Sequence, residues 1–555
     1  MRKEIPFQQA ELDTGAGGTC APGEESPSAD SVPPPLPLLD LEVRYATLRI
    51  PIIREGREET DEVTLRSYNG QLVGPSLEAR PGQTLRIRLR NNLPFVPALV
   101  EEHPHDRPHG FNVTNLHFHG MHVSPAGNAD NVMLEIGPGR EVEYEVHIPE
   151  DHHAGTFWYH PHKHGAVGIQ LGSGMAGALI VRGDIDEVPA IAAAVERILV
   201  LQQIPYMLVD DPYHPGTQAN MVEQFPQLTE VSWAALVAQG RRVTLNGEVL
   251  PTFTMQPGEV QRWRFIQAGI HNPFRLRVVK EGDAGAQRPR MYEIAYDGIT
   301  TGRLDEVPET VLHPGYRVDV LVQATGEDGA PLEPGTYLLV DEEEPHPQAR
   351  ILARVEVRAA SGEPVSTALP DPAELAPLAP FAPIEDAELT GTYVPELGQG
   401  LRGMQQAIFE VKFVGFADPN HIFDFLINGK DFDPHLDPPR QLTVGTAEEW
   451  LVASVGVASL RFPDGGEQTF RGHPFHIHVN PFHYTDKNGR IIWKDTIFVP
   501  RGESVLLRTR YQRYTGKFML HCHIVGHEDD GMAEVLELVL PDPEKQPAPT
   551  GAGGS

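Results

Sequence analysis

The sequence predicts an all-β protein made of three consecutive β-sandwich domains. A turn followed by an alternating strand occurs three times along the chain. After each of these strands, and well downstream of it, comes a strand that begins at glycine. The first set lies at 81–89, 257–265 and 444–452, and the second at 155–160, 335–340 and 516–521. Short alternating strands between Gly, Pro and Asn turns are typical of β-sandwiches. A repeat at this scale indicates one structural unit used three times.

The length of 555 residues is expected to hold two to four domains. Segments rich in Pro, Ala, Gly and Ser separate or flank the repeated units, and such composition does not bury a core. The predicted division is a disordered tail at 1–37, domains at 38–185, 186–358 and 390–541, a linker at 359–389 between the second and third domains, and a flexible tail at 542–555.

Composition excludes several classes of partner. The formal net charge of −32 argues against nucleic acid and anionic membranes, which select basic surfaces. No apolar run approaches the roughly 18 residues of a membrane-spanning helix, so we expect no membrane insertion. Only two cysteines occur, and Cys20 lies in the tail while Cys522 lies in a motif, so we expect no disulfide. The sequence leaves the oligomeric state open.

The most informative motif runs from His521 to Met532. In a β-strand, successive side chains point to opposite faces, so His521 and His523 share one face and Cys522 takes the other. His527 and Met532 follow at short spacing and could join Cys522. Thiolate, imidazole and thioether are ligands of a blue-copper electron-transfer site, provided that a second histidine arrives from elsewhere.

That histidine is expected from the segment 473–478. His476 and His478 are two residues apart and share a face, whereas His473 has the opposite parity and precedes a proline. We therefore assign His473 to the Cys522 side, and His476 and His478 to the side of His521 and His523.

Two further His-x-His pairs lie upstream, at 117–119 and 160–162. A single pair is more often a surface strand with two chance histidines. Four pairs, one of them interleaved with a cysteine, exceed what chance supplies and indicate a metal protein. Structural zinc prefers Cys-rich tetrahedral sites, so this ligand set favours copper.

The four motifs resemble those of the multicopper oxidases, a laccase-like family of three-domain enzymes, and the likeness spans about 38–541. It implies cupredoxin-like Greek-key sandwiches and four copper ions that take electrons from a small-molecule reductant and reduce O2 to water. By this resemblance His473, Cys522, His527 and Met532 hold the type 1 copper, His117 and His476 hold the type 2 copper, and His119, His160, His162, His478, His521 and His523 hold the type 3 pair.

The repeat also indicates where ligands are missing. Where the first and third domains place His160 and His521, the middle domain places Val340. We expect the middle domain to act as a spacer without copper ligands. The histidine cluster should then lie at the interface of the first and third domains, where a cleft forms without hollowing a core.

Two carboxylates have competing interpretations. Asp130 is either a turn aspartate or, as the resemblance implies, the acid beside the type 2 copper that helps to supply protons. Glu528 follows the ligand His527 and matches a carboxylate that some bacterial relatives use for proton delivery, but it also begins a plain acidic run. Together with Cys522, these are the candidate catalytic residues.

Met532 as axial ligand implies a type 1 copper of modest potential, which suits phenols and aromatic amines. The predicted activity is therefore laccase-like, that of a benzenediol:oxygen oxidoreductase. A metallo-oxidase acting on Cu(I), Mn(II) or Fe(II) is the alternative, although the eleven methionines are scattered rather than clustered. A non-catalytic copper-binding relative is disfavoured, because all twelve ligand positions are filled.

No secretory signal is seen, but similar bacterial enzymes are commonly exported, so a periplasmic or extracellular location is the expectation.

Overall fold

The computed structural model describes a mainly β chain. The described residues are 36–96, 106–214, 216–223, 243–282, 288–347, 349–359, 364–390, 392–393, 402–418, 421–463 and 467–542. Cys20 and nearly all of both predicted tails lie outside these ranges, and within them Cys522 is a free, buried cysteine. In the described part of the chain, no helix is long and apolar enough to span a membrane.

The first sandwich has one six-stranded and one four-stranded sheet. The six-stranded order is β10 (Met207–Asp210), β11 (Gln218–Met221), β2 (Arg57–Tyr68), β1 (Leu38–Arg54), β4 (Thr84–Asn91) and β6 (Glu141–His147). The four-stranded order is β3 (Leu77–Ala79), β8 (Gly177–Val181), β7 (Gly155–His160) and β5 (His117–His119). β10 and β11 come from the segment expected to begin the middle domain, yet they extend the first sheet.

The middle sandwich has a six-stranded and a five-stranded sheet. The first order is β12 (Thr244–Leu245), β9 (Val195–Gln202), β14 (Val260–Gln267), β19 (Arg317–Gln323), β16 (Arg290–Tyr296) and β17 (Ile299–Val307). The second is β13 (Thr252–Met255), β21 (Ile351–Val357), β20 (Gly335–Asp341), β15 (Phe274–Lys280) and β18 (Thr310–Leu312).

The third sandwich repeats this plan. One sheet orders β25 (Phe423–Ile427), β24 (Gln405–Phe413), β27 (Ala447–Gly456), β34 (Ser504–Arg510), β31 (Phe482–Thr485) and β32 (Ile491–Lys494). The other orders β26 (Arg440–Thr443), β36 (Ala533–Val539), β35 (Gly516–Cys522), β30 (Gly472–Ile477) and β33 (Thr496–Pro500). Small two-stranded ribbons pair β22 (Thr392–Tyr393) with β23 (Arg402–Gly403), and β28 (Ser459–Arg461) with β29 (Glu467–Thr469).

Equivalent strand pairs recur in all three sandwiches. β1 runs parallel to β4, β9 to β14 and β24 to β27. In the opposite sheets β7, β20 and β35 occupy the same place, and these are the strands that begin at glycine in each sequence repeat. The predicted all-β class with three sandwiches is therefore confirmed.

Alternation explains why the strands pack as they do. In β4, Leu85, Ile87 and Leu89 are buried while the arginines between them are only partly covered. Each sandwich encloses its own hydrophobic core between its two sheets. Trp263 is central to the middle core and Trp450 to the third. The residues of β14 are buried on both faces, because this strand also packs against the first sandwich.

In the described part of the chain the helices are short, and most of them lie in the segments between sandwiches. They are α1 (Val167–Gly172), α2 (Asp184–Glu187), α3 (Pro189–Ala192), α5 (Pro372–Leu375), the 3-10 turns η3 (Ala376–Leu378) and η4 (Asp386–Glu388), and α6 (Val525–Asp529). The predicted linker contains α5, η3 and η4, and α5 packs on β17. α1 of the first sandwich contacts α6 of the third, so the segment after Cys522 is held against the first sandwich.

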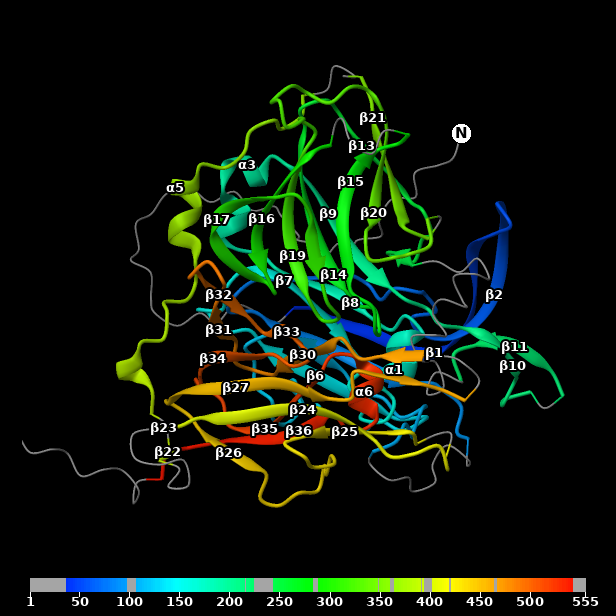
Figure 1. Ribbon diagram of the computed structural model, residues 1–555, viewed down its shortest axis with the longest axis vertical. Helices are drawn as coiled ribbons and strands as arrows, with labels where there is room; N and C mark the ends of the chain where they lie inside the picture. The colour runs from blue at the N-terminus through cyan, green and yellow to red at the C-terminus, as the bar shows by residue number, and fades with distance from the viewer. Residues whose placement is uncertain are drawn as a thin grey trace, which may run out of the picture.

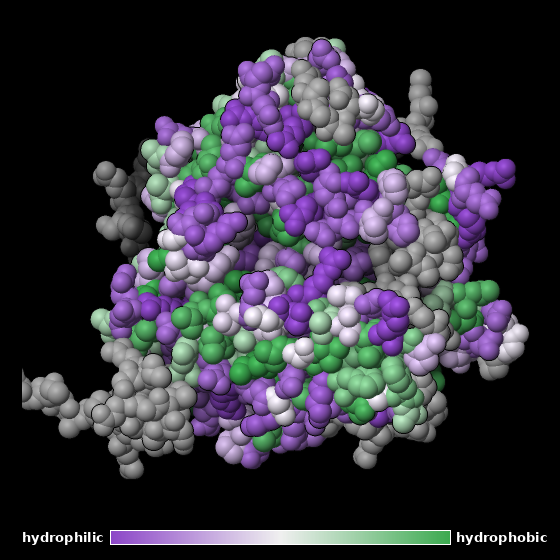
Figure 2. All heavy atoms as spheres, in the orientation of Figure 1, coloured by the Kyte–Doolittle hydropathy of each residue, from purple (hydrophilic) through white to green (hydrophobic). Residues whose placement is uncertain are grey.

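Figure 1 shows the middle sandwich in green at the top, with strands of the first and third sandwiches below it. Figure 2 shows mostly polar side chains on the same face, with hydrophobic residues gathered in the lower half, over β24 and β27. Phe413, Val414 and Val455 are among the exposed hydrophobic residues of these strands and the turn after β24.

Candidate metal centres

A sulfur and two imidazoles meet in the core of the third sandwich. Cys522 ends β35, His473 lies on the neighbouring strand β30, and His527 lies on α6. Cys522 Sγ is 3.4 Å from His473 Nδ1 and 3.8 Å from His527 Nδ1, and the two Nδ1 atoms are 3.3 Å apart. All three side chains are buried, so the third sandwich alone brings together one thiol and two ring nitrogens.

Met532 lies beside this group. Its backbone oxygen accepts a hydrogen bond from Cys522 N at 3.0 Å, and its own N–H donates to His527 O at 2.8 Å. The side chain is fully buried in the same hydrophobic cluster as Cys522. The turn of α6 therefore returns the chain to Cys522 and leaves Met532 next to the cysteine.

Aromatic rings fix the two histidines. Phe425 stacks on His527 with ring centroids 4.4 Å apart, and Phe409 stacks on His473 at 5.8 Å. Burial lowers the pKa of His473 to about 3 and holds the pKa of His527 well below its usual value, so both rings are neutral. Burial also raises the pKa of the Cys522 thiol, so a thiolate here requires a bound cation. This donor set fits a copper ion.

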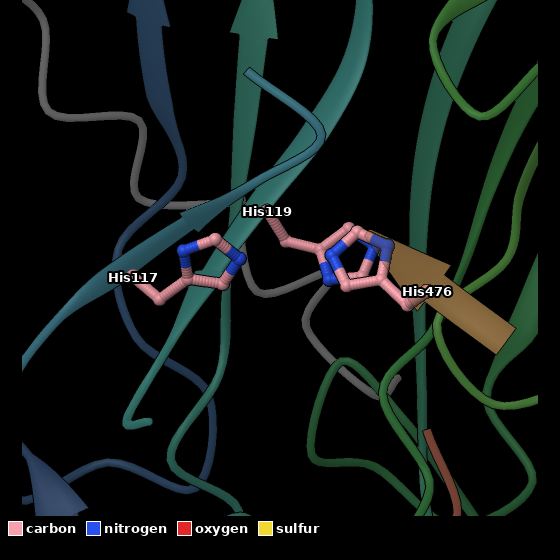
Figure 3. A group of neighbouring side chains, drawn as sticks. All are labelled: His117, His119 and His476. Atoms are coloured by element: carbon pink, nitrogen blue, oxygen red, sulfur yellow. The ribbon is translucent and has the colours of Figure 1, made fainter. Parts of the chain in front are cut away.

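Eight other histidines form a cluster between the first and third sandwiches. His117 pairs with His160 across β5 and β7, and His476 pairs with His521 across β30 and β35. His119, His162, His478 and His523 complete the set, and all eight side chains are buried. Figure 3 shows His117 and His119 from β5 with His476 from β30, the rings of His119 and His476 lying face to face. Their ring centroids are 3.9 Å apart.

The ring nitrogens converge in small groups. His119, His160 and His523 bring three nitrogens together, with His119 Nδ1 3.3 Å from His523 Nε2. His521 Nε2 lies 3.1 Å from His162 Nε2 and 3.3 Å from His478 Nε2. These two triads draw on both sandwiches, and His117 and His476 lie alongside them.

The ring nitrogens that point toward the other histidines of the cluster have the properties of metal ligands. Nε2 of His117, His160 and His476 is buried without a hydrogen-bond partner, which is unfavourable for a buried polar atom. Neutral imidazole nitrogen is the commonest metal ligand in proteins. Burial keeps the rings neutral, lowering the pKa of His162 to about 4 and the pKa values of His117, His119, His160, His478, His521 and His523 well below the usual one. The residues present therefore fit copper ions.

Asp130 contacts the outward side of His117. Its Oδ1 accepts hydrogen bonds from His117 Nδ1 and from Phe118 N, both at 2.9 Å. A proton on Nδ1 leaves the lone pair on Nε2, which faces the cluster. Asp130 is almost fully buried, and burial raises the pKa of its carboxyl to about 8. The N–H of Asp130 also donates to Ser124 O, so this residue makes a local backbone contact as well as lying beside His117, and its part in proton supply stays a prediction.

Glu528 lies between two cluster histidines. Its Oε1 is 3.4 Å from His162 Nδ1 and its Oε2 is 3.0 Å from His521 Nδ1. The side chain is fully buried, and burial raises the pKa of its carboxyl to about 7. Its neighbour Asp529 instead accepts hydrogen bonds from the first backbone N–H groups of α1. The acidic run therefore places only Glu528 against the cluster histidines.

Asp495 is a residue that sequence reasoning missed. Its Oδ1 is 3.2 Å from His119 Nε2, and its backbone oxygen accepts a hydrogen bond from His476 Nδ1 at 2.9 Å. Both contacts are made to the ring nitrogens that point away from the other histidines of the cluster. Asp495 lies between β32 and β33, and the sequence signal is weak, because a single aspartate between strands usually marks a turn.

A cavity of about 250 Å³ lies against His527 between the middle and third sandwiches. His527, Phe470 and Phe498 line it from the third sandwich. The residues that line it from the middle sandwich include His271, Arg275, His313 and Glu343. The predicted spacer therefore supplies one wall of this cavity.

Two protein-family models, both described as multicopper oxidase, match this chain, one over residues 110–185 and the other over residues 409–539. A laccase from Haloferax volcanii is 23% identical over 525 residues, covering 87% of this chain and 79% of that protein. A laccase from Bacillus stratosphericus is 24% identical, covering 86% of this chain and 91% of that protein.

A solved structure from Campylobacter jejuni, whose title calls it a multicopper oxidase and a metallo-oxidase, superposes on this chain with a TM-score of 0.59. The two sequences are 21% identical, and the superposition covers 93% of each chain. The fold is thus shared with known multicopper oxidases, and the matched regions contain most of the histidines described above. Two regions of this chain thus match multicopper oxidases, copper-dependent oxidoreductases that bind one type 1 copper, one type 2 copper and a type 3 pair, and the donor sets described above fit these ions.

Proposed function

We propose that this protein is a laccase-type oxidase, which takes single electrons from phenols or aromatic amines beside His527 and reduces O2 at the eight-histidine cluster. His473, Cys522, His527 and Met532 would hold the type 1 copper. The other ligands divide into His117 and His476 for the type 2 copper, and the triads His119, His160, His523 and His162, His478, His521 for the type 3 pair. When bound, the coppers supply one-electron oxidation and the four-electron reduction of dioxygen to water.

The cavity against His527 is the observation that carries the substrate class. Its volume of about 250 Å³ is below the roughly 300–1,000 Å³ of pockets for drug-sized ligands, so it suits a single aromatic ring. Phe498 and His313 stack at its wall with centroids 3.9 Å apart and planes 7° apart. A flat donor can pack on this surface within reach of His527, a proposed type 1 ligand that lines the same cavity.

A metal-ion substrate is supported less well by the same cavity. Glu343 is its only carboxylate among the described lining residues, and Arg275 and Arg471 already bind it at 3.1 and 3.3 Å. None of those residues is a methionine, whereas Cu(I) prefers thioether ligands. One structural relative is titled a metallo-oxidase, but the described residues that line this cavity do not form a ligand set for a metal-ion substrate.

Cys522 connects the two centres. Its side chain lies in the group with His473 and His527, and peptide bonds join it to His521 of β35 and to His523, which directly follows this strand. One strand thus provides a short covalent path between the donor site and the oxygen site. No diffusing carrier is needed between them.

Two buried carboxyls can hold protons for oxygen reduction. Producing water consumes protons, and imidazoles bound through their lone pairs cannot supply them. Asp130 Oδ1 adjoins His117 Nδ1, and Glu528 adjoins His162 and His521. A carboxyl whose pKa lies near the working pH is suited to general acid catalysis.

Oxygen uptake by the copper-loaded protein with a substrate panel tests this proposal. We expect uptake with 2,6-dimethoxyphenol and with p-phenylenediamine, and little with Cu(I), Fe(II) or Mn(II). The Cys522→Ser protein, loaded in the same way, measures background autoxidation of each reductant. Uptake above that background with metal ions alone would overturn the laccase proposal.

A further inference from the structure

We propose that Arg317, in the middle sandwich, is a positioning residue for the copper histidines. It holds the carboxylate of Asp495, which orients His119 from the first sandwich and His476 from the third. The proposal rests on the assignment of these histidines to copper. It gives the middle sandwich a part in the oxygen site, although none of the twelve predicted ligands belongs to this sandwich.

Arg317 binds Asp495 with both ends of its guanidinium fork. Nη1 donates to Oδ1 at 2.9 Å and Nη2 donates to Oδ2 at 2.5 Å. Both side chains are buried, and a buried carboxylate is stable only with a cation and hydrogen bonds. A planar fork matches a carboxylate in a way that a lysine ammonium does not, so the contact fixes the angle of the carboxylate as well as its charge.

The remaining donors of Arg317 reach the backbone of two sandwiches. Nε donates to Thr156 O of β7 at 3.2 Å. Nη1 also donates to Gly315 O at 3.0 Å, and Nη2 to Asp297 O at 2.8 Å, both in the middle sandwich. One side chain therefore joins the first sandwich, the middle sandwich and, through Asp495, the third.

Asp495 transmits this position to two rings. Its Oδ1 lies 3.2 Å from His119 Nε2 and 3.5 Å from His476 Nδ1, while its backbone oxygen accepts from His476 Nδ1. Thr496 Oγ1 donates to the same Oδ1 at 2.7 Å. Protons on these outward nitrogens leave the lone pairs on His119 Nδ1 and His476 Nε2, which face the cluster. Outward partners of this kind orient ligating histidines and set their tautomers.

Gly120 leaves space for this contact. It directly follows His119 and has a φ of +84°, a conformation that favours glycine. A Cβ at this position would lie 2.1 Å from Arg317 Nη2 and 2.5 Å from Asp495 Oδ2. The residue after a predicted ligand is thus shaped to admit the arginine–aspartate pair.

Arg317→Met tests the proposal, with Arg264→Met as the matched control. Arg264 is also fully buried in the middle sandwich and also contacts Thr156, but it binds Asp319, Asp186 and Glu196 instead of Asp495. Copper content is measured after dialysis, together with the electron paramagnetic resonance of types 1 and 2 and the blue absorption. We expect Arg317→Met to retain type 1 copper and to bind cluster copper about 10- to 100-fold more weakly, with a changed type 2 signal.

The control is expected to keep the type 2 signal of the unmodified protein, and Arg317→Lys to restore it only in part. An unchanged type 2 signal in Arg317→Met would overturn the proposal, as would equal loss in Arg264→Met. If Arg317→Met does not fold, Asp495→Asn decides, because its amide keeps the shape but donates toward His119 and His476. Normal cluster copper in Asp495→Asn would also overturn it. Lack of a type 2 signal in the unmodified protein would instead reject the copper assignment itself.

Discussion

The sulfur-containing group and the histidine cluster are built in opposite ways. His473, Cys522, His527 and Met532 all belong to the third sandwich and lie in or against its core. The eight-histidine cluster takes half of its rings from the first sandwich and half from the third, and its outward contacts include a residue held by the middle one. The first site depends on the packing of one core. The second depends on how three sandwiches dock.

This difference predicts which changes affect one centre and spare the other. A change within the third core should alter the type 1 signals alone. A change at the interface should alter the cluster while the blue colour persists. The variants below test that separation, beginning with the largest expected effect.

Cys522→Ser should abolish both the blue absorption and steady-state turnover. The serine hydroxyl does not supply the thiolate, and the donor site then loses its connection to the cluster. The type 2 resonance should persist, since none of its proposed ligands changes. Absorption spectra and oxygen uptake measure the loss, and a blue band in this variant would contradict the assignment.

Asp130→Asn should slow reoxidation by oxygen about 100-fold, within the range usual for a lost proton donor. The amide keeps the shape but cannot release the proton that the buried carboxyl holds. Anaerobic bleaching by a reductant should stay near normal, because the type 1 group lies in another sandwich. Stopped-flow absorbance follows both phases. Equal slowing of the two would mean that Asp130 only closes the turn.

Glu528→Gln should remove part of the pH dependence of oxygen reduction. Burial raises the pKa of Glu528 to about 7, so the carboxyl keeps its proton below that pH and loses it as the pH rises. Proton supply by this group therefore declines above pH 7 in the unmodified protein. The glutamine variant should be about 10-fold slower at pH 6 and flatter across pH 6–8. Glu503→Gln, at an exposed position of the same sandwich, serves as the control and should keep the full profile.

Met532→Leu should have the smallest effect, a higher type 1 potential with unchanged cluster signals. The thioether is a weak donor to Cu(II), and its loss destabilises the oxidised ion at that site only. Redox titration of the blue band measures the change. A fall in potential would exclude Met532 as the axial ligand.

Much of the fold was predictable, because each sandwich repeats the same local signals. The strand that begins at glycine at 335–340 takes the place of β7 and β35, as the repeat predicted, and it ends at Val340 and Asp341 where the others carry histidines. Strand parity likewise predicted that His476 and His478 would share the face of His521. These inferences succeed because they depend on neighbours a few residues apart.

The outward partners of the cluster could not be found in this way. His119 and Asp495 are 376 residues apart, and Arg317 and Asp495 are 178 apart. Their contacts arise only when three sandwiches dock, and no local pattern distinguishes a buried arginine on β19 from an exposed one. For the same reason the middle sandwich was expected to be only a spacer, whereas it also lines the cavity at His527 and binds Asp495.

The copper content and resonance spectrum of the loaded protein test the central claim most directly. Two separately built centres with this ligand set predict four coppers per chain, two of them visible by electron paramagnetic resonance in equal amounts, one with the narrow splitting of type 1 and one with the wide splitting of type 2. The coupled type 3 pair should remain silent. A single copper with only the narrow signal would contradict the account, because the eight histidines between the sandwiches would then hold none.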